Sequence, residues 1–345
     1  MITADKWVRF QYYKRINEEK VQPALWSIGE KDQAIRVDRC GEFVKVAKCN
    51  GCGTKHFKGH TSCQVRWCMN CMHKKLLCWV KRLVPIFEAW YAEGNFVSML
   101  NFTVRDAMPL TEPLEMLETS YRALYNSNSR KRRDFWQDRF PGGVRSLEVK
   151  IGSKSGQWHP HYHCLVMQRS GEFIKDYDWL SRDWHNIVGH NGREVVNSKG
   201  QPDMDWNGNV YIRKVSERRK NGILQAVCES LKYIMKVDGK IFGRDDGSAV
   251  NMTLFEEAYF TLKNKRQTST WGLLYNISDE VENDFEEEET YSLVNFICQR
   301  CGCTEGELLD MVYGYMNKDR VLFDISNDDK KISAPGTKRS VQTDN

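Results

Sequence analysis

The sequence lacks three features that would assign it to large classes of protein. No run of roughly 18 apolar residues occurs in its 345 residues, which excludes a membrane-spanning helix. Residues 1–11 contain no apolar core of a signal peptide, so we expect a cytoplasmic protein. No Gly-x-x-x-x-Gly-Lys-Ser/Thr loop is present, which excludes a recognisable P-loop ATPase.

The C-terminal part of the chain is acidic, whereas the rest of the chain is basic. Residues 279–345 hold 16 acidic and 7 basic residues, whereas residues 1–278 hold 44 basic and 30 acidic residues. A basic region of this size favours a polyanionic partner such as nucleic acid over the alternative of an ordinary solvated surface. The basic residues that we expect to contact DNA are Arg130, Lys131, Arg132, Arg133, Arg213, Lys214, Lys232, Lys265 and Arg266.

Seven of the twelve cysteines fall between Cys40 and Cys78. In a cytoplasmic protein such a cluster indicates metal rather than disulfides. Two Cys-x-x-Cys pairs are typical of tetrahedral zinc sites, and a redox role is less favoured because the flanks are basic and aromatic. We predict one or two structural zinc ions, with ligands drawn from Cys40, Cys49, Cys52, Cys63, Cys68 and Cys71, and with His56 or His60 as further candidates.

A second, smaller group of cysteines lies near the C-terminus. It consists of Cys298, Cys301 and Cys303. No fourth ligand is evident beside them in the sequence. We therefore predict ordinary buried thiols at these positions rather than a metal site.

Three histidines alternate with other residues in front of an apolar run. They are His159, His161 and His163, followed by Cys164-Leu165-Val166-Met167. The run predicts a buried strand, and residues two apart in a strand point to the same face. The imidazoles of His161 and His163 would therefore lie side by side, close enough to share one metal ion.

A carboxylate that could complete this site lies on the preceding predicted strand. Glu148 has apolar neighbours, and a buried carboxylate normally has a partner. Two imidazoles and one carboxylate leave coordination positions open for water and a phosphate oxygen, which suits catalytic Mg²⁺ or Mn²⁺. We predict Glu148, His161 and His163 as ligands. We expect His159 to support them from behind, with direct ligation as the alternative.

The segment from Gly222 to Val237 predicts a helix with two faces. The apolar face consists of Leu224, Val227, Cys228, Leu231, Ile234 and Met235, and the polar face consists of Glu229, Lys232, Tyr233 and Lys236. An amphipathic helix with an incidental tyrosine is the simpler interpretation. Beside a metal site, however, a tyrosine hydroxyl can attack phosphorus, a lysine can stabilise its phenolate and a glutamate can act as general base. We predict Tyr233, Glu229 and Lys236 as catalytic residues.

The order of expected elements indicates an α+β fold. Strands at 96–104, 144–151 and 158–167 alternate with helices, and an antiparallel pair lies at the centre. We predict an N-terminal segment at 1–92 with a zinc module at 40–78, and a catalytic domain at 93–278. An acidic linker at 279–290, a helical C-terminal segment at 291–325 and a disordered tail at 326–345 would follow.

Four motifs taken in order resemble the HUH endonucleases, specifically the rolling-circle replication initiator (Rep) proteins of small plasmids. They are Leu100-Asn101-Phe102-Thr103-Val104-Arg105, His159-Pro160-His161-Tyr162-His163, Glu229-x-x-x-Tyr233-x-x-Lys236, and the cysteine segment 63–71. The resemblance covers roughly residues 36–278. The segment after residue 279 does not map onto the family.

The resemblance implies a fold, a mechanism and partners. The fold would be the HUH-nuclease fold, a central antiparallel sheet with flanking helices. Tyr233 would nick one strand at an origin and stay linked to the 5′ phosphate, and Glu229, in place of a second tyrosine, would activate water for termination. The partners would be single-stranded or hairpin DNA at an origin and a host helicase, because the chain has no ATPase motif of its own. A homodimer is left open.

Two other functions fit part of the pattern. A single-tyrosine transposase would use the same chemistry, whereas a relaxase is disfavoured because its tyrosine usually precedes the histidines. A zinc-containing DNA-binding regulator without enzyme activity is the third hypothesis. It would leave the Glu148, His161, His163 and Tyr233 set without a purpose.

Overall fold

The computed structural model describes residues 4–125, 136–169, 178–190, 210–215, 222–232, 239–243, 249–286, 297–316 and 319–324. The chain divides into two compact units. The smaller unit is assembled from residues 1–14, 39–63 and 290–345, and the larger from residues 15–38 and 64–289. Both ends of the chain therefore contribute to the smaller unit.

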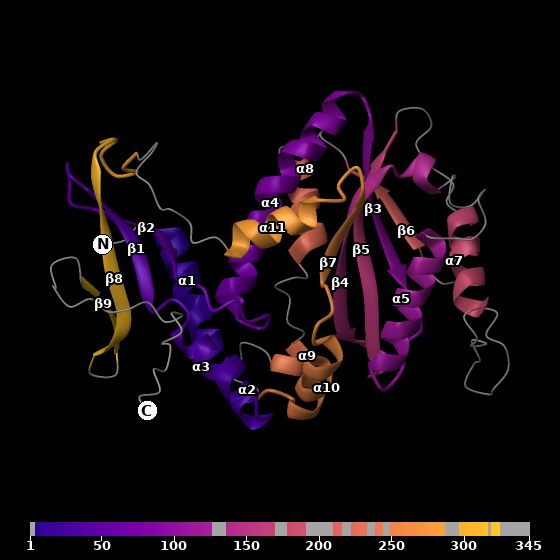
Figure 1. Ribbon diagram of the computed structural model, residues 1–345, viewed down its shortest axis with the longest axis horizontal. Helices are drawn as coiled ribbons and strands as arrows, with labels where there is room; N and C mark the ends of the chain where they lie inside the picture. Colours follow the sequence, from indigo (N-terminus) through magenta and orange to yellow (C-terminus); the bar gives the residue numbers. More distant parts are fainter. Residues whose placement is uncertain are drawn as a thin grey trace, which may run out of the picture. The chain divides into compact units, whose positions relative to one another are not determined.

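The larger unit is built on a five-stranded antiparallel sheet with the order β6-β3-β5-β4-β7 (Figure 1). The central strand β5 is buried over nearly its whole length, as the apolar run in its sequence predicts. The expected central antiparallel pair is confirmed as the hairpin of β4 and β5. The strands are β3 (Phe96–Thr103), β4 (Gly142–Ile151), β5 (Trp158–Gln168), β6 (Val210–Lys214) and β7 (Thr268–Gly272).

Helices cover both faces of this sheet, so the predicted α+β class is confirmed. Figure 1 shows α4 (Met69–Ala92), α8 (Gly222–Leu231) and α11 (Ile277–Glu286) on one face and α5 (Thr111–Tyr125) and α7 (Asp178–His190) on the other. Tyr162 of β5 packs against Tyr121 of α5, with ring centroids 5.1 Å apart. The neighbouring residues His161 and His163 must then point to the opposite face, on the side of α8.

The predicted acidic linker is wrong for residues 279–286, because they belong to α11. Val281 and Phe285 are buried on one side of this helix. Its carboxylates pair with cations of α4: Arg82 donates to Asp284 at 2.7 Å, and Lys75 pairs with Glu282. The cations of α4 therefore neutralise the carboxylates of α11, so their mutual repulsion no longer prevents a helix.

Helix α4 continues through Pro85 without interruption. A proline inside a helix costs about 3 kcal/mol because it removes one hydrogen bond and crowds the preceding turn. Leu83 and Phe87, four residues apart, are fully buried on the other side of the helix. Burial of two such side chains contributes about 3–6 kcal/mol, which is enough to offset the proline.

The smaller unit contains a four-stranded antiparallel sheet with the order β2-β1-β8-β9. Its strands are β1 (Phe43–Cys49), β2 (Lys55–His60), β8 (Gly306–Met316) and β9 (Asp319–Asp324). The prediction of a helical C-terminal segment is therefore wrong. Leu309, Met311 and Tyr313 are buried at a spacing of two, which is the period of a strand and not of a helix.

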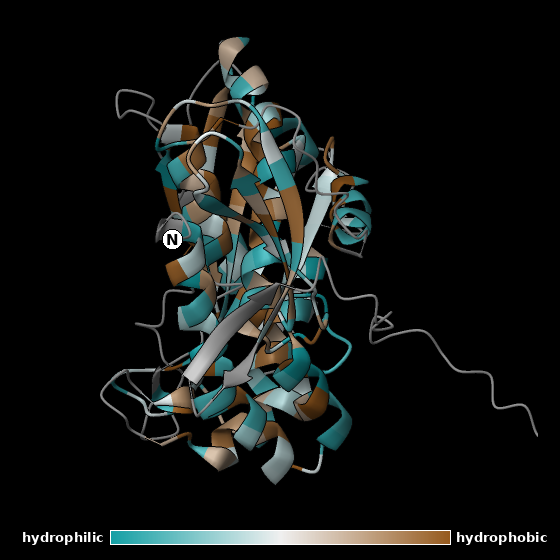
Figure 2. Ribbon diagram, turned by 90° about the vertical axis from the view of Figure 1, so that its left-hand side faces the viewer, coloured by the Kyte–Doolittle hydropathy of each residue, from teal (hydrophilic) through white to brown (hydrophobic). Residues whose placement is uncertain are grey.

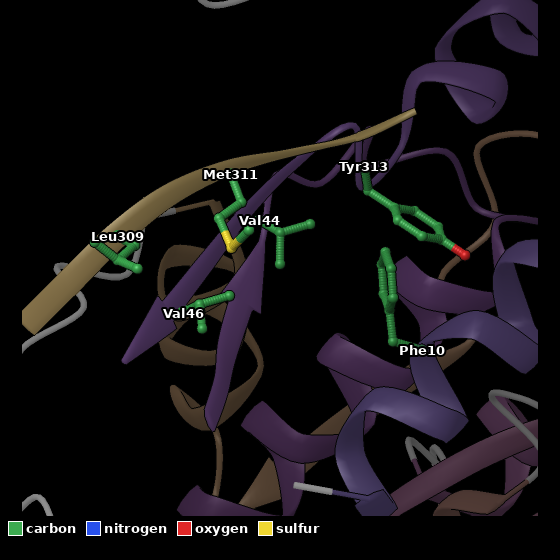
Figure 3. Packing of buried hydrophobic residues seen from close by; sticks show 6 residues of the cluster. All are labelled: Phe10, Val44, Val46, Leu309, Met311 and Tyr313. Atoms are coloured by element: carbon green, nitrogen blue, oxygen red, sulfur yellow. The ribbon is translucent and has the colours of Figure 1, made fainter. Parts of the chain in front are cut away.

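A compact apolar cluster stabilises this sheet (Figure 3). Phe10 of α1 (Ala4–Ile16) packs against Tyr313 of β8 with ring centroids 5.6 Å apart. The other members are Val44 and Val46 of β1 together with Leu309 and Met311 of β8. Strands more than 250 residues apart in the sequence therefore share one core.

The remaining helices are short, and most of them lie in the larger unit. They are η1 (Asn17–Val21), α2 (Gln22–Ser27), α3 (Lys31–Arg39), α9 (Gly239–Phe242) and α10 (Met252–Leu262). In Figure 2 the helices alternate hydrophobic and hydrophilic residues along their length, as expected for helices that bury one side. Within the part of the chain that the structure describes, no helix is both long and apolar enough to cross a membrane.

A candidate metal centre on the central sheet

The register of the central hairpin brings the three predicted ligands together. Glu148 of β4 lies directly opposite His161 of β5, and His163 follows two residues later on the same face. One ligand atom from each residue lies within 4.8 Å of the other two. All three side chains are buried, with exposed fractions of 3% for Glu148, 4% for His161 and 6% for His163.

The hydrogen bonds behind the two histidines fix their tautomers. His161 Nδ1 lies 3.3 Å from the carbonyl oxygen of His159, and His163 Nδ1 lies 2.8 Å from Oδ1 of Asn101 on β3. Both partners are acceptors, so each Nδ1 carries the proton and donates it. Each Nε2 of a neutral imidazole then presents a lone pair that can act as a metal ligand.

Both of these lone pairs face the same carboxylate oxygen. Oε2 of Glu148 lies 2.5 Å from Nε2 of His161 and 3.0 Å from Nε2 of His163. Burial lowers the pKa of His161, and it lowers the pKa of His163 to about 4, so both rings are neutral near pH 7. Two imidazole nitrogens and one carboxylate oxygen at these distances form a ligand set that could hold a divalent cation.

His159 lies beside this group but contacts a different carboxylate. Its Nδ1 pairs with Oδ1 of Asp106, and its ring centroid is 5.1 Å from that of His161. The side chain is not part of the group formed by Glu148, His161 and His163. A supporting role for His159 is consistent with this position and stays a prediction.

The proposed nucleophile lies outside the described residues, as does Lys236. Tyr233 immediately follows Lys232, the last described residue of this segment. One helical turn earlier, Glu229 of α8 is about half exposed and forms an ion pair with Lys232. Helix α8 contacts both the sheet and α4, and its buried face includes Val227 and Leu231, as predicted, together with further residues. Ile223, Ala226 and Ser230 are buried, whereas the predicted Leu224 and Cys228 are only partly buried.

The predicted DNA-binding residues do not all share the face of the metal group. On the edge strand β6, Tyr211 lies in register with Asn101 and His163, and Arg213 lies in register with Met99 and Leu165. Alternation along the strands therefore places Tyr211 and Arg213 on the face of the histidines. The side chain of Tyr211 is 53% exposed, which leaves its ring accessible.

The other predicted cations have different surroundings. Lys214 lies on the opposite face from Arg213, with its ammonium 3.9 Å from the centre of the Phe96 ring. Lys265 pairs with Glu118 at 2.7 Å, and Arg266 lies 3.7 Å from Asp279. Arg130, Lys131, Arg132 and Arg133 lie outside the described residues.

The predicted zinc ligands are divided between the two units. Cys40, Cys49, Cys52 and Cys63 belong to the smaller unit, whereas Cys68 and Cys71 belong to the larger one. A zinc ion shared across these two sets stays a prediction. His60 contacts the carbonyl oxygen of Thr61 through Nδ1, whereas His56 lies beside Cys298. Cys49 and Cys52 lie beside Cys298 and Cys301, an arrangement that the sequence did not predict.

Asn101 is a member of this site to which the sequence analysis gave no role. It stands in the first of the four motifs and contacts His163 across β3 and β5. Its position opposite a histidine could have been found by pairing the two strands in register. Such acceptors orient metal-binding imidazoles and raise their basicity.

Replacing Asn101 with leucine is expected to weaken Mn²⁺ binding by roughly 10- to 100-fold, because the Nδ1–H of His163 loses its acceptor and the tautomer is no longer fixed. Titration of the metal-free protein with Mn²⁺, followed by calorimetry, measures the effect. Asn95→Leu is the matched control, since Asn95 lies outside the metal group and its amide makes an exposed 3.4 Å contact with Glu93. An unchanged Mn²⁺ affinity in Asn101→Leu would exclude this role.

Comparison with known proteins identifies the family. Residues 54–297 match the family described as "Replication protein". The chain is 24% identical over 279 residues to a protein named "Protein rep" from Lactiplantibacillus plantarum, an alignment that covers 78% of this chain and 80% of that protein. It is 23% identical over 230 residues to a "Protein rep" from Streptococcus pneumoniae serotype 2, which covers 63% of this chain and 64% of that protein. No solved structure matches this chain.

The matched residues span more than half of the sequence, so the chain belongs to this family of replication proteins. The resemblance to Rep proteins drawn from its four motifs is confirmed at that level. The match includes the central hairpin and α8, and thus the buried Glu148, His161 and His163 group.

Proposed function

We propose that this protein initiates rolling-circle replication by nicking and joining single-stranded DNA at an origin. The observation that carries the proposal is the buried group of Glu148, His161 and His163, whose ligand atoms all lie within 4.8 Å of one another. Membership of a replication-protein family supports a DNA substrate. The exposed Tyr211 and the cationic Arg213 lie on the same face, where one suits stacking on a base and the other suits a phosphate.

Tyr233 is the proposed nucleophile of the nicking step. Its phenolic oxygen attacks the scissile phosphorus, so a P–O bond to tyrosine forms while the bond to the 3′ oxygen breaks. The phenol proton leaves before or during attack, and the departing 3′ oxygen takes up a proton to become a free 3′-OH. Lys236, three residues later in the sequence, is the proposed cation that stabilises the phenolate.

Glu148, His161 and His163 are the proposed ligands of Mg²⁺ or Mn²⁺. When bound, such an ion supplies Lewis-acid polarisation of a phosphate oxygen. Asn101 and the carbonyl oxygen of His159 hold the two imidazoles with Nε2 toward the ligand position. Burial of all three side chains keeps bulk water away from that position, which strengthens electrostatic interactions there.

Glu229 is the proposed general base for termination. Replacing it with alanine is expected to leave nicking within about twofold of wild type but to slow hydrolytic release of the covalent adduct by roughly 10²- to 10⁴-fold, because a positioned base contributes about that much. A pulse-chase with labelled oligonucleotide measures the two steps separately. Glu256→Ala on α10, an exposed site, serves as the control. Equal release rates in Glu229→Ala and wild type would remove Glu229 from the mechanism.

One experiment distinguishes this function from the two alternatives, a zinc-containing DNA-binding regulator and a single-tyrosine transposase. Incubation with Mn²⁺ and a supercoiled plasmid carrying the chain's own origin is expected to give the nicked circle, and EDTA is expected to prevent it. Specific binding without any nicking, in the presence of Mn²⁺, would instead indicate a zinc-containing regulator. Nicking confined to transposon ends would indicate the single-tyrosine transposase.

The proposal also defines the setting in which the protein acts. Its substrate would be an unpaired strand, such as an extruded hairpin at the origin, because tyrosine attack needs an accessible phosphate. Strand separation ahead of the fork would come from a host helicase. The site of action would be the cytoplasm.

A further inference from the structure

The smaller unit contains a second group of side chains that could hold a metal ion. Its ligand atoms are sulfurs, whereas those of the group on the central sheet are nitrogens and an oxygen. Four sulfur atoms, from Cys49, Cys52, Cys298 and Cys301, all lie within 4.8 Å of one another. Cys49 Sγ is 3.6 Å from Cys301 Sγ, and Cys52 Sγ is 3.6 Å from Cys298 Sγ. Four sulfurs at 2.3 Å from a tetrahedral zinc ion lie about 3.8 Å apart, so the observed spacing is that of a zinc tetrathiolate and not of a disulfide.

The two halves of this group have the same backbone geometry. Each is a Cys-x-x-Cys-Gly turn, one ending at Gly53 and the other at Gly302. Gly53 has φ +68° and donates its N–H to the carbonyl oxygen of Cys49 at 2.9 Å, while Gly302 has φ +74° and donates to Cys298 at 2.8 Å. A positive φ at the residue after the second cysteine favours glycine. Two separate stretches of sequence thus form turns of the same type, and their thiols lie close to one another.

The surroundings of the four thiols favour a bound cation. His56, which is buried, has Nε2 3.4 Å from Sγ of Cys298, a position from which it can donate to a thiolate. The adjoining hydrophobic cluster is small and includes, besides the cysteines, Ala47 and the partly buried Leu308. The main apolar cluster of this unit lies around Phe10 and Tyr313, so the few apolar side chains beside the cysteines contribute little to stability there, and a bound metal ion would add to it.

We infer that Cys49, Cys52, Cys298 and Cys301 bind one structural zinc ion, which links the end of β1 and the turn after it to the loop that precedes β8. All four residues lie outside the part of the chain that matches the replication-protein family, residues 54–297. Cys301 is exposed, contrary to the prediction of buried thiols, and the proposed site would give Cys298 and Cys301 a role as ligands. The site also means that the smaller unit is completed only by residues from both ends of the chain.

Zinc content of the full-length protein tests the inference. Purified wild type is expected to hold one more equivalent of zinc per chain than the double variant Cys298→Ser/Cys301→Ser, as measured by mass spectrometry of metals. The double variant Cys49→Ser/Cys52→Ser is expected to lose the same equivalent. The matched control is Cys303→Ser, because Cys303 lies in the same loop but outside the group of four.

A second measurement keeps the test decisive if the serine variants fold poorly. Co²⁺ bound to the wild-type chain is expected to show the intense visible and sulfur-to-metal charge-transfer bands of a tetrathiolate. The single variant Cys301→His is expected to keep the ion with a shifted spectrum. Equal zinc content in wild type and both double variants, zinc loss in Cys303→Ser alone, or two disulfides in the unreduced protein would each overturn the inference. None of these readouts depends on DNA nicking, so the proposed function stands or fails separately.

Discussion

Replacing Tyr233 with phenylalanine is expected to abolish the covalent protein–DNA adduct and to lower origin nicking by at least about three orders of magnitude. Phenylalanine keeps the ring but lacks the oxygen that must form the bond to phosphorus, so the first chemical step cannot occur. The measurement is an SDS gel of protein incubated with Mn²⁺ and a labelled single-stranded origin oligonucleotide. Wild type is expected to give a labelled band and Tyr233→Phe none.

Tyr275→Phe is the matched control for this substitution. Tyr275 is 74% exposed and follows β7, so loss of its hydroxyl should not affect nicking. A labelled adduct that persists in Tyr233→Phe would show that another residue is the nucleophile. The metal group could then still be correct, because its geometry does not depend on Tyr233.

Replacing Glu148 with glutamine is expected to weaken Mn²⁺ binding and to reduce nicking by at least about 10²-fold. Lewis-acid catalysis contributes several kcal/mol, and each 1.36 kcal/mol changes a rate about tenfold. Glutamine has the same shape as glutamate, but it presents no negative charge to the two imidazoles. Calorimetric Mn²⁺ titration and a nicking time course measure the two effects in the same preparation.

The control for this variant is Glu256→Gln, which removes an exposed carboxylate from α10. A further arm raises the Mn²⁺ concentration, since a variant that only binds metal weakly should recover part of its activity. Full activity of Glu148→Gln at low Mn²⁺ would contradict the assignment of Glu148 as a ligand. Activity unaffected by EDTA would contradict metal dependence altogether.

The central sheet and its metal group could be predicted from the sequence because their signals are local. His161 and His163 stand at the strand period in front of an apolar run, and a turn joins their strand to that of Glu148. Pairing two neighbouring strands in register then suffices to place the three side chains together. The same logic, extended to β3, would have revealed Asn101.

The smaller unit could not be predicted in this way because its contacts are not local. Strand β8 pairs with β1, more than 250 residues earlier in the sequence. No local sequence pattern predicts which strand is the partner. The alternation of Leu309, Met311 and Tyr313 did carry a strand signal. Without the partner strand, however, the sequence offers no fourth ligand near Cys298 and Cys301, which favours plain thiols there.

The acidic segment shows a different limit of sequence reasoning. Glu280, Glu282 and Asp284 repel one another in an isolated chain, which favours a linker. In the structure Lys75 and Arg82 of α4 neutralise them, and Val281 and Phe285 supply a buried side.

The most direct test of the proposed mechanism is to identify the amino acid that carries the DNA. Wild-type protein is incubated with Mn²⁺ and a single-stranded origin oligonucleotide, the adduct is digested with nuclease and trypsin, and the modified peptide is sequenced by mass spectrometry. Cleavage after Lys232 and Lys236 isolates Tyr233–Lys236 as a four-residue peptide. The account predicts this peptide with a nucleotide 5′ phosphate on Tyr233. A nucleotide on any other residue, or no adduct under conditions that give nicked DNA, would contradict it.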